Sequence, residues 1–183
     1  MKKSHLSSFS VKKKRSSHLF KNGTVCIFLC LALFLSACGG SKSSPEEVLK
    51  AICQSQSDLP AGRLYVLSAP SDDARHPDDG WLFAMFGKEE LPATLSLVED
   101  AAFFSSYTHA CEFAVFLCKS AKGTSAVSQL CLQRLNTLKL YWEAAENNDT
   151  PLQNAGVTVR GKWVILYLCK DPDAALRAFR RTL

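Results

Sequence analysis

Acidic residues are absent from the first quarter of this chain, because no aspartate or glutamate occurs before Glu46. Seven of the 22 lysine and arginine residues lie before residue 25, so 15 basic residues face 17 acidic residues in the remainder. The formal net charge of +5 therefore belongs to the N-terminal segment, and the rest of the chain is slightly acidic. A nucleic-acid partner would need a basic patch in the folded part, so we expect no such partner.

The short motifs of common enzymes and metal sites are absent too. After Cys38 there is no glycine-rich phosphate loop, Gly-x-Ser-x-Gly or His-Glu-x-x-His, and Ser120 and Lys122 are too close for a Ser-x-x-Lys arrangement. No Cys-x-x-Cys occurs, and only His76 and His109 remain in this part. We expect no catalytic residue, no cofactor and no metal, with a hydrolase as the weaker alternative.

The N-terminal segment has the organisation of a secretory signal. Its basic stretch leads into an uninterrupted apolar run, Val25 to Leu35, and then into the small residues Ser36 and Ala37. A basic region, a short apolar region and small residues at the cut site define a signal peptide. The run is shorter than the roughly 20 apolar residues that a membrane-spanning helix needs.

The end of this segment resembles the lipobox of bacterial lipoproteins in the four residues Leu35-Ser36-Ala37-Cys38. The resemblance implies cleavage before Cys38, which becomes an N-palmitoyl, S-diacylglyceryl cysteine. Two acyl chains suffice for stable anchoring, so we predict a lipoprotein on the extracytoplasmic face of the cell membrane. The alternative is an ordinary signal peptide followed by a coincidental cysteine.

The domain organisation follows from this cut site. Residues 1–37 are the predicted signal peptide, and residues 38–44 are the lipidated cysteine and a flexible glycine- and serine-rich tether. Residues 45–183 have the length of one ordinary domain, with an N-terminal part at 45–88 and a sheet and helix core at 89–183.

Cysteine usage gives no disulfide framework. Five cysteines follow Cys38, an odd number, and each lies in an apolar segment. An exported protein can form disulfides, so pairing stays open, but we interpret these residues mainly as small core hydrophobes. They are Cys53, Cys111, Cys118, Cys131 and Cys169.

The N-terminal part predicts one helix, a short strand and a solvated loop. Ser44-Pro45-Glu46-Glu47 is a strong helix start, and apolar residues recur at helical spacing as far as Cys53. Residues 64–67 can form a short strand, and residues 81–86 one or two helical turns. Residues 70–80 carry four aspartates, but their spacing does not fit a calcium-binding EF-hand, so a solvated loop is expected.

The C-terminal part predicts the sheet. Residues 95–104 and 111–118 suggest paired strands, and a helix follows from Gly123 with an apolar stripe from Val127 to Ala145. Residues 157–159 and 162–169 flank Arg160-Gly161 as a hairpin, and Asp171-Pro172 opens a last helix. The order strand-strand-helix-strand-strand-helix, preceded by the N-terminal helix, indicates an α+β domain. We expect a mainly antiparallel sheet with helices on one face.

Three polar residues stand out in this core: Glu112 on a strand that is otherwise apolar, Arg134 on the long helix, and His109 in a loop. Glu112 could serve in proton transfer. A buried carboxylate is more often paired with a basic residue, so we predict a structural ion pair between Glu112 and Arg134. His109 is expected to be solvated.

Several short segments resemble a bacterial lipoprotein family known as domain of unknown function 4358. The segments are Phe86-Gly87, Glu112-Phe113-Ala114-Val115, Arg134, Pro151-Leu152-Gln153 and Gly161-Lys162-Trp163-Val164. They span most of residues 45–183. The resemblance implies a lipid-anchored protein with this fold, and it implies no activity.

Together these features predict a non-catalytic binding or interaction module held by membrane lipid through Cys38. Its partner would be an envelope protein or a small ligand. The alternative is a structural component of the cell envelope. An exposed aromatic patch would favour binding, and a long unpaired strand edge would favour assembly.

Overall fold

The computed structural model describes residues 43–89, 91–145 and 152–183, which belong to one unit. Cys38 and the predicted signal peptide lie outside the described residues, as do residues 38–42 of the predicted tether. The elements in chain order are α2 (Pro45–Gln54), β1 (Arg63–Val66), α3 (Asp79–Phe86), α4 (Leu91–Leu95), β2 (Val98–Ser105), β3 (Glu112–Cys118), the 3-10 turn η1 (Ala121–Gly123), α5 (Thr124–Glu143), the 3-10 turn η2 (Leu152–Asn154), β4 (Gly156–Arg160), β5 (Trp163–Leu168) and α6 (Pro172–Thr182).

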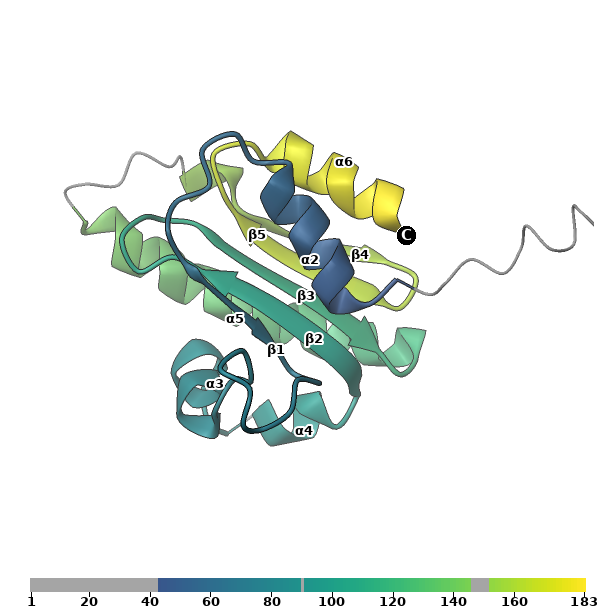
Figure 1. Cartoon of the computed structure of the whole chain (residues 1–183). Helices are drawn as coiled ribbons and strands as arrows, with labels where there is room; N and C mark the ends of the chain where they lie inside the picture. Colours follow the sequence, from purple (N-terminus) through teal and green to yellow (C-terminus); the bar gives the residue numbers. More distant parts are fainter. Residues whose placement is uncertain (1–42, 90, 146–151) are drawn as a thin grey trace, which may run out of the picture. The chain divides into compact units, whose positions relative to one another are not determined.

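The strands form one antiparallel sheet in the order β1-β2-β3-β5-β4 (Figure 1). The predicted α+β class and antiparallel sheet are confirmed, and so is the element order from β2 to α6. β1 is the short strand expected near residues 64–67, and it lies at one edge of the sheet. β3 lies between β2 and β5, in agreement with its prediction as a central strand.

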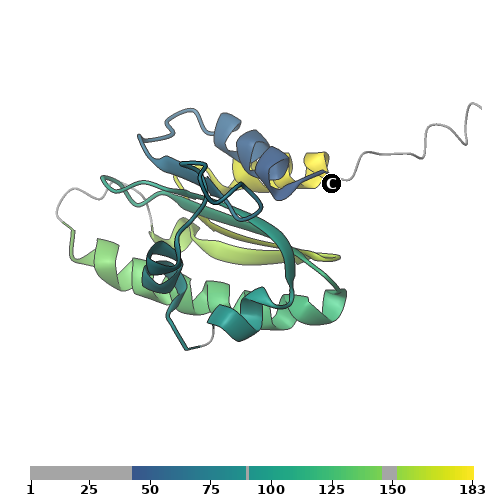
Figure 2. The same ribbon diagram turned by 60° about the horizontal axis from the view of Figure 1, so that its bottom comes forward.

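Helices cover both faces of the sheet, so the prediction that they lie on one face is wrong (Figure 2). Phe103 and Phe116 point to the face covered by α3, α4 and α5. Side chains alternate between the two faces along a strand, so Phe104 and Phe113, each an odd number of residues away on the same strand, point to the face covered by α2 and α6. The central strands are apolar on both sides, and each apolar face must be covered by another layer. The apolar stripes of the two terminal helices supply the second layer.

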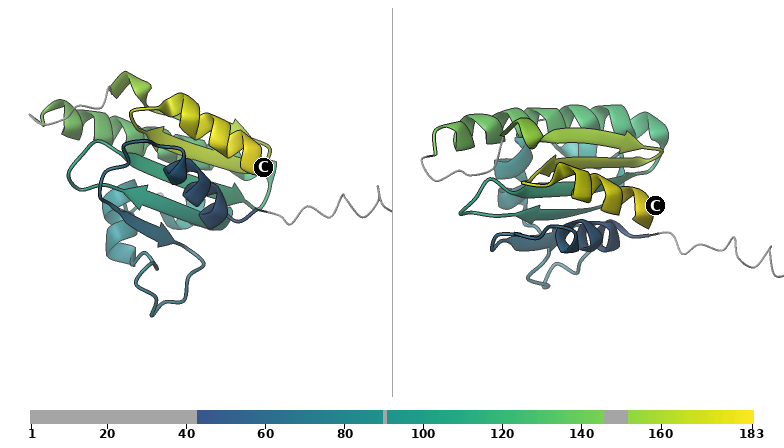
Figure 3. Two further views of the ribbon diagram at one scale, coloured as in Figure 1. Left: turned by 45° about the horizontal axis from the view of Figure 1, so that its top comes forward. Right: turned by 90° about the horizontal axis from the view of Figure 1, so that it is seen from above.

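α2 and α6 lie side by side on that second face (Figure 3). α2 begins with a capping box, in which Ser44 Oγ accepts from the backbone N–H of Glu47 and the Glu47 carboxylate accepts from the N–H of Ser44. α6 begins with Asp171, whose carboxylate accepts from the N–H of Ala174. Both helices carry proline in the first turn, as their sequences predicted.

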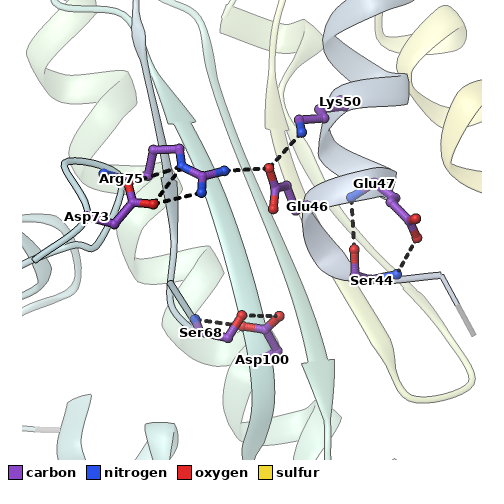
Figure 4. A network of polar contacts seen from close by, with 8 residues as sticks. All are labelled: Ser44, Glu46, Glu47, Lys50, Ser68, Asp73, Arg75 and Asp100. Carbon is purple, nitrogen blue, oxygen red and sulfur yellow. Dashed lines mark hydrogen bonds and ion pairs between the residues drawn. The ribbon is translucent and has the colours of Figure 1, made fainter. Parts of the chain in front are cut away.

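The loop between β1 and α3 is exposed over most of its length but is attached to α2 by charged side chains (Figure 4). Arg75 donates to Asp73 and, through Nη1, to Glu46 Oε1 at 2.8 Å. Glu46 also pairs with Lys50 one turn along α2. Hydrogen bonds from the Arg75 side chain and backbone lower the pKa of Asp73 to about 2. The predicted solvated loop therefore has one fixed point on the helix layer.

The β4–β5 hairpin turns at Gly161-Lys162, one residue later than the sequence predicted, because Arg160 still pairs with Trp163. Gly161 has φ +59°, and the described residues include no non-glycine residue with positive φ. A positive φ at the first of two loop residues is the pattern of a type II′ turn, which only glycine adopts without strain.

The apolar stripe of α5 is buried as predicted at Val127, Cys131, Leu135, Leu138 and Trp142. The predicted Ala145 follows the end of the helix and is half-buried.

The five described cysteines are free thiols, and all except the half-buried Cys53 are buried. Burial raises the pKa of the Cys53, Cys111 and Cys169 thiols to about 12. Their predicted position among core hydrophobes is confirmed.

Candidate functional site

Glu112 and Arg134 meet between the sheet and α5. Glu112 is the first residue of β3 and is only 2% exposed. Arg134 Nε donates to Glu112 Oε1 at 2.9 Å, and Arg134 Nη2 donates to Glu112 Oε2 at 2.7 Å. This two-pronged geometry holds a guanidinium in one orientation and is the strong form of an arginine–carboxylate contact.

Ser105 completes the environment of the carboxylate. It lies opposite Glu112 in the β2–β3 register, and its hydroxyl donates to Glu112 Oε2 at 3.3 Å. The buried carboxylate therefore has donors from β2 and from α5, and its negative charge is compensated by Arg134. Most of the hydrogen-bonding capacity of the carboxylate is therefore used within the protein, as is typical of a structural ion pair.

A cavity of about 240 Å³ opens beside this pair, and we call it the tyrosine-rimmed pocket. It is lined by Met85 of α3, by residues at the β2–β3 turn and by one face of α5. The residues from the turn are Ser105, Ser106, Tyr107, Cys111 and Glu112, and those from α5 are Arg134, Thr137, Leu138, Tyr141 and Trp142. Its lining is mostly apolar, with a few buried polar groups such as Glu112 and Ser105, which is the usual composition of a small-ligand site.

Two exposed tyrosines form the rim of the pocket. Tyr107 is 65% exposed and Tyr141 is 66% exposed. The hydroxyl of Tyr107 lies 3.0 Å from that of Tyr65 on β1, which fixes the Tyr107 ring at the end of the sheet. Tyr141 packs edge-on against Trp142, with the two ring centroids 5.1 Å apart. Both rings are therefore positioned by contacts while their outer faces stay open to solvent.

The helical period explains how α5 supplies one wall of the pocket. Four residues of α5 line the pocket at successive steps of three, one and three residues, and this spacing places them on one face of the helix. They are Arg134, Thr137, Leu138 and Tyr141. That spacing was visible in the sequence beside the buried stripe and could have identified Tyr141. The sequence around Ser105 and Tyr107 did not indicate that they line a pocket, because their positions depend on the pairing of β2 with β3.

His109 does not join Glu112 and Arg134. It is exposed in the loop before β3, where its Nδ1 lies 2.9 Å from the Thr108 hydroxyl oxygen. It lines a different cavity, of about 390 Å³, together with Cys111, Cys169 and residues 56–60. Of the three polar residues that stood out in the sequence, His109 therefore lies apart from the Glu112–Arg134 pair.

Side chains of the types that bind metal ions are spread over the part of the chain that the structure describes. Its histidine, cysteine, aspartate and glutamate side chains form no group of three placed to hold a metal ion. Two of the four loop aspartates have other partners, since Asp73 binds Arg75 and Asp78 accepts from the N–H of Trp81 at the start of α3. Within residues 43–89, 91–145 and 152–183, no helix has the length and apolar content needed to cross a bilayer.

Comparisons of the chain with protein-family models, with curated proteins and with solved structures give no significant match. The resemblance to domain of unknown function 4358 therefore stays a prediction. In the structure, Gly87 follows α3 with φ +82°. Gly161 and Lys162 form the turn of the β4–β5 hairpin, and Trp163 and Val164 begin β5. Pro151 lies outside the described residues.

Proposed function

We propose that this protein is a lipid-anchored extracytoplasmic binding module whose ligand site is the tyrosine-rimmed pocket. The anchor is supported by the basic segment, the short apolar run and the lipobox-like ending at Cys38. The exposure of Tyr107 and Tyr141 at the mouth of a cavity carries the binding proposal. Exposed rings at a partly polar cavity offer apolar contact area at a low cost in side-chain entropy.

The charges in the pocket favour an uncharged ligand. Glu112 and Arg134 cancel each other, so an anion gains little from the guanidinium and a cation gains little from the carboxylate. The Ser106 hydroxyl is already used, because it donates to Ala61 O and accepts from the N–H groups of Thr108 and His109. The hydroxyls of Tyr141 and of Tyr107, which also contacts Tyr65, remain as hydrogen-bonding groups along the wall. A small group with one apolar or aromatic face and a few hydrogen-bonding atoms fits this composition. We propose no catalytic role for the pocket.

A structural role in the cell envelope has weaker support. Assembly through strand addition would need a long exposed edge, and the two edge strands, β1 and β4, have only four and five residues. Short edge strands are a common protection against edge-to-edge association. The exposed aromatic residues therefore favour binding over assembly.

The binding proposal is tested by NMR titration of the full chain in detergent with N-acetylphenylalanine amide, which is uncharged and aromatic. We expect shifts at Arg134 Nε–H and at the methyl groups of Leu138, with smaller shifts for the anionic N-acetylphenylalanine. Tyr141→Ala should abolish them. Leu140→Ala is the matched control, because Leu140 is 71% exposed on the same helix and does not line the pocket. Equal shifts in both variants, or none in the wild type, would refute the proposed site.

A further inference from the structure

Two cysteines from distant parts of the sequence face each other at the end of the sheet. The β3–β5 register runs from Leu117↔Trp163 to Glu112↔Leu168. Extended one step beyond the ends of both strands, this register places Cys111 opposite Cys169, and the two thiols are close enough to interact electrostatically. Both side chains belong to the apolar cluster on the α2 and α6 side, together with Phe113 and Ile165, so the two thiols lie on the same face.

The backbone hydrogen bonds show which kind of antiparallel pair this is. The N–H of Cys118 donates to Lys162 O, so Cys118 and Lys162 are a hydrogen-bonded pair across β3 and β5. Hydrogen-bonded and non-hydrogen-bonded pairs alternate, and Cys111 is an odd number of residues away. The carbonyl of Cys111 also accepts from the N–H of Ser106, on the β2 side. Cys111 and Cys169 are therefore a non-hydrogen-bonded pair.

Pairs of this kind have the spacing that a disulfide requires. Non-hydrogen-bonded antiparallel partners have Cα atoms about 4.5 Å apart. Disulfides bridge Cα distances of about 4.4–6.8 Å, with the two side chains on the same side. The strand register thus gives Cys111 and Cys169 the generic spacing of a pair that a disulfide can bridge.

The two cysteines can be reached from solvent through a cavity. Both line the cavity of about 390 Å³ that also includes His109, Lys170 and Asp171. The thiols are nearly inaccessible by themselves, with 6% of Cys111 and 1% of Cys169 exposed, but the cavity is large enough for a small oxidant. By contrast, Cys118 and Cys131 are buried and line none of the cavities described here.

We propose that Cys111 and Cys169 form a cross-strand disulfide in the extracytoplasmic protein by exchange with a small-molecule or protein disulfide. Each thiol loses one proton and one electron as the Sγ–Sγ bond forms, and the disulfide of the oxidant is reduced to two thiols. The proposal rests on the proposed localisation, because such bridges persist outside the reducing cytoplasm.

The surroundings of the pair would make the bridge long-lived. Burial raises the pKa of both thiols to about 12, and the neighbouring Cys169 contributes to the shift at Cys111. A thiol with a raised pKa is a poor leaving group, so a bridge made from two of them resists reduction by exchange. The same shift leaves little thiolate to attack the oxidant, so the bridge also forms slowly. Cys53 on α2 is the third thiol near Cys111, but it has no register position in the sheet.

Peptide mapping of the full chain tests the proposal in two arms. In the first, protein is taken from membranes with free thiols blocked by N-ethylmaleimide before unfolding. In the second, protein purified under reductant is incubated with oxidised glutathione. We expect a peptide joined through Cys111 and Cys169 in both arms. Its absence from both arms, or a joined peptide containing Cys53 instead, overturns the disulfide. A bridge in the second arm alone supports the disulfide and overturns the proposed compartment.

Thermal melts of the oxidised full chain give an independent readout. The melting temperature of the wild type should fall when reductant is added, since the bridge closes a long loop of the unfolded chain. Cys169→Ala should melt at the same temperature with and without reductant. Cys131→Ala is the control and should keep the dependence on reductant. A wild-type melting temperature that does not respond to reductant contradicts the proposal.

Discussion

The guanidinium of Arg134 approaches the carboxylate of Glu112 side-on, and two hydrogen bonds of 2.9 and 2.7 Å join the long helix to the first residue of the central strand. The side chain of Glu112 is 3% exposed and that of Arg134 is 13% exposed. Both residues line the tyrosine-rimmed pocket, so the contact links the stability of the domain to the shape of its proposed ligand site.

Glu112→Ala should destabilise the domain strongly. Removing one partner of a buried pair leaves the other charge without compensation, at a cost of roughly 3–5 kcal/mol. Adding Arg134→Met should recover part of this loss, because the double variant leaves no unpaired charge in the core. Urea unfolding of the single and double variants measures both effects.

Glu99→Ala is the matched control for that experiment, because Glu99 is exposed on the neighbouring strand β2. It should change the free energy of unfolding by less than about 0.5 kcal/mol. A wild-type stability for Glu112→Ala would mean that the ion pair does not stabilise the fold. The carboxylate would then become a candidate for a functional role.

Asp73→Asn should weaken the attachment of the β1–α3 loop to α2 in a pH-dependent way. The pKa of Asp73 is lowered from 3.8 to about 2 by its hydrogen bonds with Arg75. Because the folded pKa is the lower one, the contribution to stability is present above about pH 4 and is lost as the pH falls through about 2. The variant should melt below the wild type at neutral pH, and the difference should vanish near pH 2.

The effect at Asp73 will be small, since the contact is exposed to solvent and screened by salt. Asp72→Asn is the control, because Asp72 is the exposed neighbour in the same loop. The melting temperatures of both variants and the wild type, measured from pH 2 to pH 7, test this prediction. A difference from the wild type that is the same at pH 2 and pH 7 would exclude a charge effect.

Cys38→Ala should abolish lipidation. The thiol of Cys38 is the proposed acceptor of the diacylglyceryl group, so the variant should keep its N-terminal segment and take up no fatty-acid label. Metabolic labelling with a fatty-acid analogue, followed by gel electrophoresis, measures this directly. Cys30→Ala, in the apolar run of the same segment, should be labelled like the wild type. Full labelling of Cys38→Ala would refute the proposed anchor.

Helix starts and strand positions were largely predictable, because they depend on residues a few positions apart. Ser44, Pro45 and Glu47 encode the start of α2 through a capping box that needs no other part of the chain. The apolar stripe of α5 follows from helical periodicity alone. The placement of the helices was not predictable in the same way. The alternation of Phe103 and Phe104 shows two apolar faces, but it does not say which helix covers each.

The sequence by itself determined the predicted sorting signal, the α+β class and the candidate pair Glu112 and Arg134, since charge, periodicity and an isolated buried carboxylate are local features. Only the tertiary structure decided that Tyr107 and Tyr141 share one pocket and that Cys111 faces Cys169. The two tyrosines meet because α5 packs beside the β2–β3 turn. The position of Cys111 opposite Cys169 depends on strand register, and a slip of one residue would turn each strand side chain to the opposite face of the sheet. Register is set by the packing of the whole sheet between its two helix layers, which no single segment encodes.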